Sequence, residues 1–83
     1  MFDSQDYPHP LNESLFAKWL EQGRSSPIPY TYLLVIWDEL DRRYLPIYTQ
    51  SRSEMTKFPR FGVAMDQRSM VAAYDLYSES RIM

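Results

Sequence analysis

The sequence predicts a small α+β domain in which an N-terminal helix packs on an antiparallel sheet of about four strands, in the order α-β-β-(short α)-β-β. Three observations predict this class: an apolar stripe at helical spacing, one strongly apolar strand, and three further β-like segments separated by polar or proline-containing stretches. The 83 residues, 45% of them hydrophobic and 24% charged, are typical of one globular domain. We divide the chain into an extended arm over residues 1–10, where Pro8 and Pro10 flank His9, and a single domain over residues 11–83.

The helix is expected between Asn12 and Gly23. Asparagine is a preferred N-cap, and glycine supplies a left-handed stop. Between these two residues the apolar side chains recur at helical spacing and form one stripe, which consists of Leu15, Phe16, Trp19 and Leu20.

The central strand is expected from Tyr30 to about Asp38, directly after Pro29. Its apolar side chains occupy both faces: Tyr32, Leu34 and Ile36 on one, Leu33, Val35 and Trp37 on the other. A strand that is apolar on both faces is covered on both. Because the helix covers only one face, we expect another element or a second subunit on the other.

A hairpin is expected next, because Glu39 to Arg43 is polar and Tyr44 to Gln50 resumes a β-like composition. Pro46 has no backbone N–H to donate. It therefore places this second strand at a sheet edge or at a bulge.

The remaining elements are a short helical turn and two strands. Ser51 and Ser53 are candidate caps for the turn, which Pro59 limits in length. Two strands then follow, Phe61 to Met65 and Met70 to Tyr77, joined by a four-residue loop over 66–69.

Composition favours a cytoplasmic protein that does not cross a membrane. The sequence contains no cysteine, which fits a reducing compartment. Residues 1–6 are acidic where a signal peptide is basic, and the longest apolar run, Tyr32 to Trp37, is far shorter than the roughly 20 residues of a membrane helix.

Enzymatic signatures are weak, and we expect no catalytic residue, metal site or cofactor. His9 has no orienting partner nearby in sequence, and no nucleophile or phosphate-binding motif is present. A carboxylate- or metal-dependent enzyme is an alternative, because acidic residues gather at the two expected hairpins. Solvated turns explain the same residues more simply; they are Asp38, Glu39, Asp41 and Asp66.

Binding of RNA or single-stranded nucleic acid through residues 42–68 is a second alternative. Residues 1–41 carry a net charge of −5 and residues 42–83 one of +3. The 42–68 segment interleaves six basic residues with aromatic ones, as in sheets that bind single strands. The overall net charge of −2 opposes polyanion binding outside this segment.

The favoured function is non-catalytic protein binding by an accessory or regulatory protein, such as an inhibitor, adaptor or assembly factor. Aromatic residues make up 16% of the chain, and tyrosine, tryptophan and arginine are enriched in protein interfaces. We expect a protein partner, a second copy of the chain in a homodimer, or both. The expected partner-binding residues combine an aromatic centre with a basic rim: Trp37, Arg42, Arg43, Tyr44, Tyr48 and Arg60.

Overall fold

A computed structural model describes residues 10–59 and 68–82 of the chain. Its elements are α1 (Glu13–Arg24), β1 (Tyr32–Asp38), β2 (Arg43–Thr49), the 3-10 helix η1 (Arg52–Lys57) and β3 (Arg68–Asp75). The three strands form one antiparallel sheet in the order β2-β1-β3. The expected α+β class is therefore confirmed. The strand expected over Phe61 to Met65 lies outside the described residues.

Helix α1 begins as its sequence predicts. The Asn12 side chain accepts hydrogen bonds from the backbone N–H groups of Ser14 and Leu15, which have no partner within the helix. The role expected for Gly23 is wrong, because the helix continues through it to Arg24, and Ser25 caps the end. Gly23 is buried against the sheet, so its missing side chain serves close packing.

The sheet places β1 in the centre, as its two apolar faces require. Strand β2 pairs along the whole length of β1, and Pro46 lies opposite Val35. The sheet order makes β2 an edge strand, which confirms the expected position of the proline.

Strand β3 departs from the expectation at its start. Arg68 and Ser69 belong to the strand, and not to a loop over 66–69, because they pair with Asp38 and Trp37 of β1. A register shift between Val35 and Ile36 leaves one extra residue on β3.

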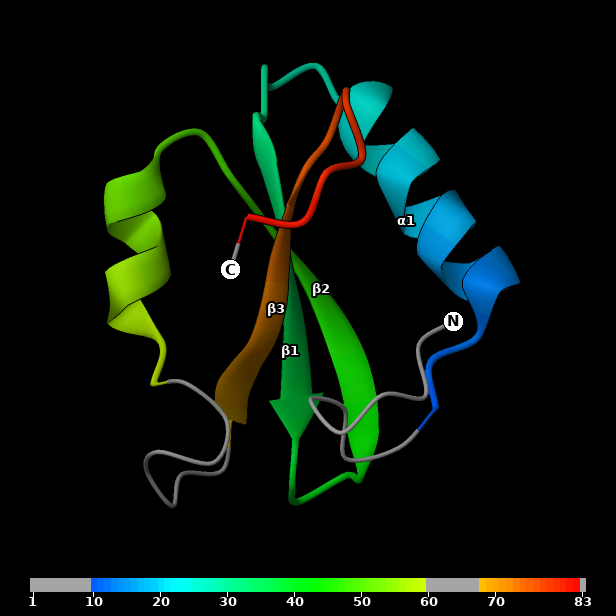
Figure 1. Ribbon diagram of the computed structural model, residues 1–83, viewed down its shortest axis with the longest axis vertical. Helices are drawn as coiled ribbons and strands as arrows, with labels where there is room; N and C mark the ends of the chain where they lie inside the picture. The colour runs from blue at the N-terminus through cyan, green and yellow to red at the C-terminus, as the bar shows by residue number, and fades with distance from the viewer. Residues whose placement is uncertain (1–9, 60–67, 83) are drawn as a thin grey trace.

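The two faces of the sheet carry two separate apolar clusters. Figure 1 shows α1 on one side of the sheet and η1 on the other. The first cluster joins the buried helix side chains to Leu33, Val35 and Trp37 of β1. The second cluster joins Leu34 and Ile36 of β1 to η1, β3 and the C-terminal segment through Met55, Met70, Ala73, Phe58 and Ile82.

The second face of β1 is therefore covered by the chain itself. Leu34 and Ile36 are fully buried, and Met55 of η1 is only 2% exposed. Of the two covers expected for this face, another element or a second subunit, the structure shows another element, namely η1 together with the C-terminal segment (Figure 1). The argument for a homodimer loses this support.

At its C-terminal end, α1 forms hydrogen bonds with the segment that follows β3. The Arg24 side chain donates to the carbonyl oxygen of Leu76 at 2.6 Å and to the Glu79 carboxylate at 3.1 Å. Backbone hydrogen bonds from Asp75 to Ser80 and from Ile82 to Ala73 fold the C-terminal segment back along β3. Among the described residues, no helix has the length and apolarity needed to cross a membrane.

Candidate functional site

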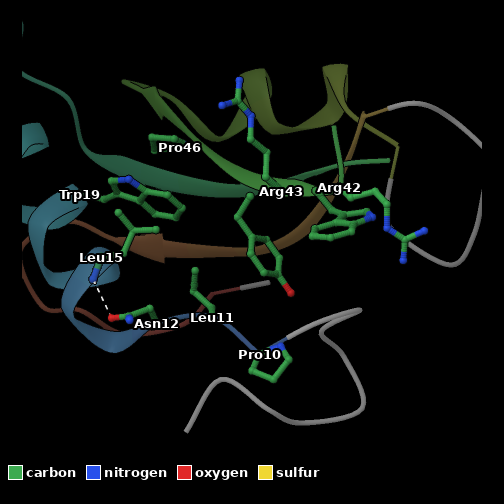
Figure 2. A pocket seen from close by; sticks show the side chains of 10 residues that line it. Pro10, Leu11, Asn12, Leu15, Trp19, Arg42, Arg43 and Pro46 are labelled. Atoms are coloured by element: carbon green, nitrogen blue, oxygen red, sulfur yellow. Dashed lines mark hydrogen bonds between the residues drawn. The ribbon is translucent and has the colours of Figure 1, made fainter. Parts of the chain in front are cut away.

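An open groove of about 610 Å³ lies between the start of α1 and the β1–β2 hairpin. Figure 2 shows the side chains that line it. Three segments contribute: the chain entering the helix, the helix itself, and the two strands with their turn. The lining residues are Pro10, Leu11, Asn12, Leu15, Trp19, Trp37, Arg42, Arg43, Tyr44 and Pro46.

Two aromatic side chains from paired strand positions form part of the groove wall. Trp37 and Tyr44 face each other across β1 and β2, and their rings meet edge to face with centroids 4.9 Å apart. The Trp37 indole N–H donates to a carboxylate oxygen of Glu39 at 2.7 Å, and Trp37 is only 3% exposed. Trp37 is therefore held rigidly in the wall, whereas the half-buried Tyr44 offers more of its ring to the groove.

The helix supplies a second apolar wall. Leu15 belongs to the stripe expected from the sequence, but 39% of it is exposed, because it turns toward the groove and not into the core. Trp19 and Leu11 are buried beside it. The cap on Asn12 fixes the start of the helix and so the position of Leu15 relative to the hairpin.

Arginine supplies the only charge among the described lining residues. Arg42 is exposed at the hairpin turn and has a left-handed backbone, with φ at 54°. Figure 2 shows the Arg42 side chain at the opposite end of the view from Leu15, Trp19 and Pro46. The Arg43 guanidinium extends away from Pro10 and Leu11, and it lies 3.6 Å from the Asp41 carboxylate. The two arginines thus give the hairpin end of the groove its positive charge.

Asp38 fixes the shape of the hairpin that carries Arg42. Its Oδ1 accepts the backbone N–H groups of Leu40 and Asp41, and its Oδ2 accepts the Nε–H of Arg68 at 3.1 Å. The N–H of Asp41 makes the largest contribution to lowering the Asp38 pKa, and Arg68 and Leu40 lower it further, against the opposing effect of desolvation. The charged form of Asp38 therefore stabilises the turn.

Tyr48 does not line the groove, although the sequence suggested it for partner binding. Its hydroxyl donates to the carbonyl oxygen of Trp19 at 2.6 Å. Its ring stacks on the Tyr30 ring, with the two ring centroids 5.5 Å apart. Desolvation raises the Tyr48 pKa. These contacts give Tyr48 a structural role in holding α1 to β2.

The structure thus brings together four of the six side chains expected to bind a partner: Trp37, Arg42, Arg43 and Tyr44. Tyr48 packs beneath the helix, and Arg60 lies outside the described residues.

The basic residues that the structure describes in the 42–68 segment do not share one face. Arg42 and Arg43 both line the groove, but the Arg43 guanidinium extends away from Pro10 and Leu11 (Figure 2). Arg52 and Lys57 belong to η1, which packs on the opposite face of the sheet, and the Arg52 guanidinium lies 6.0 Å from the centre of the Tyr32 ring. The basic and aromatic residues follow one another in the sequence, but those that the structure describes lie on different parts of the surface.

The acidic residues of the first hairpin are each engaged by a neighbour. Glu39 accepts the Trp37 indole N–H, Asp41 pairs with Arg43, and Asp38 binds its turn and Arg68. Within residues 10–59 and 68–82, no three potential metal ligands come together. Asp66 lies outside the described residues.

Sequence reasoning missed the helix side of the groove. Leu15, Trp19 and Pro46 carried only structural interpretations, Leu11 carried none, and Pro10 was assigned to an arm. The start of the helix lies beside the hairpin because of the strand register and the position of the helix, and no local sequence pattern encodes either of these.

Comparisons with family models, curated proteins and solved structures found no match.

Proposed function

We propose that this chain is a protein-binding accessory or regulatory domain, and that its groove accepts an extended segment of a partner in which an apolar side chain lies near an acidic one. The observation that supports this proposal is the combination of apolar groove walls with positive charge at the hairpin end of the groove. The described lining residues include Leu15, Trp19, Tyr44 and Pro46 as apolar contacts, two arginines, and no carboxylate.

The apolar walls provide most of the binding free energy in this proposal. Burying one leucine- or phenylalanine-sized side chain of the partner contributes about 1.5–3 kcal/mol. An exposed ion pair with Arg42 adds only about 0.2–1 kcal/mol, so its main effect is on orientation and rate of encounter. The proposed interaction is therefore reversible and depends on one or two apolar anchors.

Protein binding is favoured over nucleic-acid binding by the positions of the described basic residues, because Arg42 lines the groove whereas Arg52 and Lys57 belong to η1 on the opposite face of the sheet. A single strand tracked by its phosphates needs a continuous basic path with exposed aromatic rings beside it. In this chain Tyr48 is held beneath α1 by its hydroxyl, and Phe58 packs into the second cluster. We place the binding in the cytoplasm, a proposal that rests on the absence of cysteine from the sequence.

Selection from a displayed library of random peptides tests the proposal. The full chain should enrich peptides in which an apolar residue has Asp or Glu close by. The Leu15→Glu variant should lose this enrichment, because it places a carboxylate in the apolar wall at a half-exposed position that the core does not need.

Two variants at Arg42 separate charge from folding. Arg42→Asn removes the charge but tolerates the left-handed backbone, and Arg42→Lys keeps the charge. We expect Arg42→Asn to weaken the enriched peptides about threefold or more, and Arg42→Lys to bind like the wild type. Enrichment that survives Leu15→Glu, or salt-sensitive binding of single-stranded RNA that displaces the peptides, contradicts the proposal.

A further inference from the structure

We infer that the partner segment bound in the groove contains proline and has a polyproline II conformation, with its proline rings on the apolar walls and its carbonyl oxygens on nitrogen donors of this chain. This inference rests on the proposed function and names the class of segment that the groove takes. The side chains that line the groove offer many hydrogen-bond donors and almost no acceptors, and a proline-containing segment complements such a lining.

Nitrogen donors predominate among the polar side chains of the groove. An arginine guanidinium and a tryptophan indole are donors only. Oδ1 of Asn12 accepts the backbone N–H groups of Ser14 and Leu15, which occupies both of its lone pairs and leaves the Nδ2 amide group as a donor. Among the described lining side chains, only the Tyr44 hydroxyl can accept a further hydrogen bond.

The two indole N–H groups of the groove differ in their partners. Trp37 donates to Glu39 at 2.7 Å. Trp19 is only 6% exposed, and its indole nitrogen makes no hydrogen bond with the residues that the structure describes. This nitrogen is not one of the fully buried polar atoms that lack a partner, so solvent reaches it at the groove. A nearly buried residue thus holds a donor that a carbonyl oxygen of a bound segment satisfies.

A lining rich in donors distinguishes proline from other residues of a bound peptide. A backbone N–H group of the partner that is buried in the groove loses its water and finds only the Tyr44 hydroxyl as an acceptor. Proline has no backbone N–H group and keeps its carbonyl oxygen. A buried N–H group without an acceptor weakens binding about tenfold. The groove therefore selects proline at the most deeply buried positions of the segment.

The strand beside the groove favours a polyproline II segment over an added β-strand. Pro46 lies on β2, which is an edge strand of the described sheet, and it has no N–H group to pair with a further strand. A polyproline II segment needs no such pairing, because its backbone makes no internal hydrogen bonds and leaves its carbonyl oxygens available. Its prolines also preform the bound conformation, which lowers the entropy cost of binding.

Charge completes the description of the segment. The lining residues include two arginines and no carboxylate, and the arginines lie at the hairpin end. An acidic residue beside the prolines complements them. The partner class is therefore a proline-containing segment with an adjacent aspartate or glutamate.

Replacement of individual prolines in a bound peptide tests the inference. The probe is the most enriched peptide of the library selection, and its affinity for the full chain is measured by isothermal titration calorimetry. Each proline is replaced in turn by alanine, which restores the N–H group, and by N-methylalanine, which does not. We expect alanine at one or two positions to weaken binding about tenfold, and N-methylalanine at the same positions to stay within about threefold of the parent peptide.

Asn12→Ser tests the donors of the protein itself. Serine is also a preferred N-cap, so the helix start is retained while the Nδ2 amide group is lost. We expect this variant to bind the parent peptide about threefold more weakly. Gln22→Ala, which removes an amide group from an exposed position of the same helix outside the groove lining, is the matched control and should bind like the wild type. In proton spectra, the Trp19 indole signal should move downfield as the peptide binds, because its N–H gains an acceptor.

The inference and the proposed function fail in different ways. Enriched peptides without proline, or alanine and N-methylalanine replacements that bind alike, show that the N–H group plays no part. The inference is then wrong, and the proposed function stands if enrichment still depends on Leu15. N-methylation that abolishes binding at alternate positions of the peptide indicates strand pairing and also overturns the inference. If no peptide is enriched in a Leu15-dependent manner, the proposed function itself is wrong.

Discussion

Gly23 determines how closely α1 approaches the sheet. A Cβ at this position would lie 2.6 Å from Cε1 and 2.9 Å from Cδ1 of Tyr48, and 2.9 Å from Cδ2 of Leu76. The Tyr48 ring cannot move aside freely, because its hydroxyl is bound to the Trp19 carbonyl. The tyrosine and the glycine therefore act as one packing unit.

Gly23→Ala should destabilise the protein by about 1–2 kcal/mol. The overpacking cost exceeds the gain in helix propensity, which is about 1 kcal/mol. Urea unfolding measures the difference. Gln22→Ala, at the neighbouring exposed position, is the control and should change the free energy of unfolding by less than about 0.5 kcal/mol. A Gly23→Ala variant more stable than the wild type contradicts the packing described.

Asp38 and Asp75 should make stability depend on acid pH. Both carboxyl groups have a lowered pKa: the backbone N–H of Asp41 is the main cause at Asp38, and the N–H groups of Ser78 and Tyr77 are the causes at Asp75. A folded-state pKa below the unfolded one stabilises the protein above the unfolded pKa, about 3.9 for aspartate. This stabilisation is lost as the pH falls through the folded-state pKa.

Asp38→Asn isolates one of these contributions. Asparagine keeps an oxygen for the turn but loses the charge that faces Arg68. The difference in unfolding free energy between wild type and variant should be largest near neutral pH and shrink as the pH falls from about 5 to about 2. A difference that stays constant over this range contradicts the role given to the charge.

At the scale of elements, local signals were sufficient for some of the structure. The Asn12 cap and the apolar stripe predict α1, the two apolar faces predict the central position of β1, and Pro46 predicts an edge strand. The start of β3 was not predictable, because Arg68 and Ser69 are polar and join the strand through pairing with β1. Non-local pairing overrides local composition there.

Local sequence signals also did not identify the element that covers the second face of β1. Met55 is the only buried residue of η1. The sequence of η1 therefore has no amphipathic pattern from which its packing on a sheet could be predicted. Its position follows from the N-cap at Ser51 and the path of the chain after β2. Sequence reasoning therefore left open whether another element or a second subunit covers this face.

Met55→Ala should test η1 as the cover of that face. Removing this buried side chain should lower the unfolding free energy by about 2–5 kcal/mol. Lys57→Ala, at an exposed position of the same 3-10 helix, is the matched control and should cost less than about 0.5 kcal/mol. Equal effects of the two substitutions would show that η1 does not pack as described.

At the scale of the whole molecule, both sheet faces are covered from within one chain. Among the described strands β2 lies at an edge of the sheet, and its Pro46 weakens pairing with another strand. We therefore expect a monomer of 10.0 kDa by size-exclusion chromatography with light scattering. A dimer whose mass persists on dilution contradicts this expectation and points to association through another surface.

The groove forms only when the helix packs on the sheet, so the candidate site depends on the fold of the whole molecule. Trp37, Arg42, Arg43 and Tyr44 are close together in the hairpin and all line the groove, and their part in binding stays a prediction. The helix residues that complete the groove are separated from them in sequence. The packing of α1 on the sheet brings the two groups together, with Leu15 left half-exposed at the seam.

Both tryptophans of the chain line the groove, so their indole N–H signals report on it directly. The decisive measurement follows these signals in ¹H–¹⁵N correlation spectra of the full chain during titration with a selected acidic, apolar peptide. The account predicts that the signals of Trp19 and Trp37 change together, that the amide of Met55 on the opposite face does not, and that Arg42→Asn weakens the response about threefold or more. Changes centred on η1, or peptide binding that leaves both indole signals unmoved, would contradict the groove as the binding site.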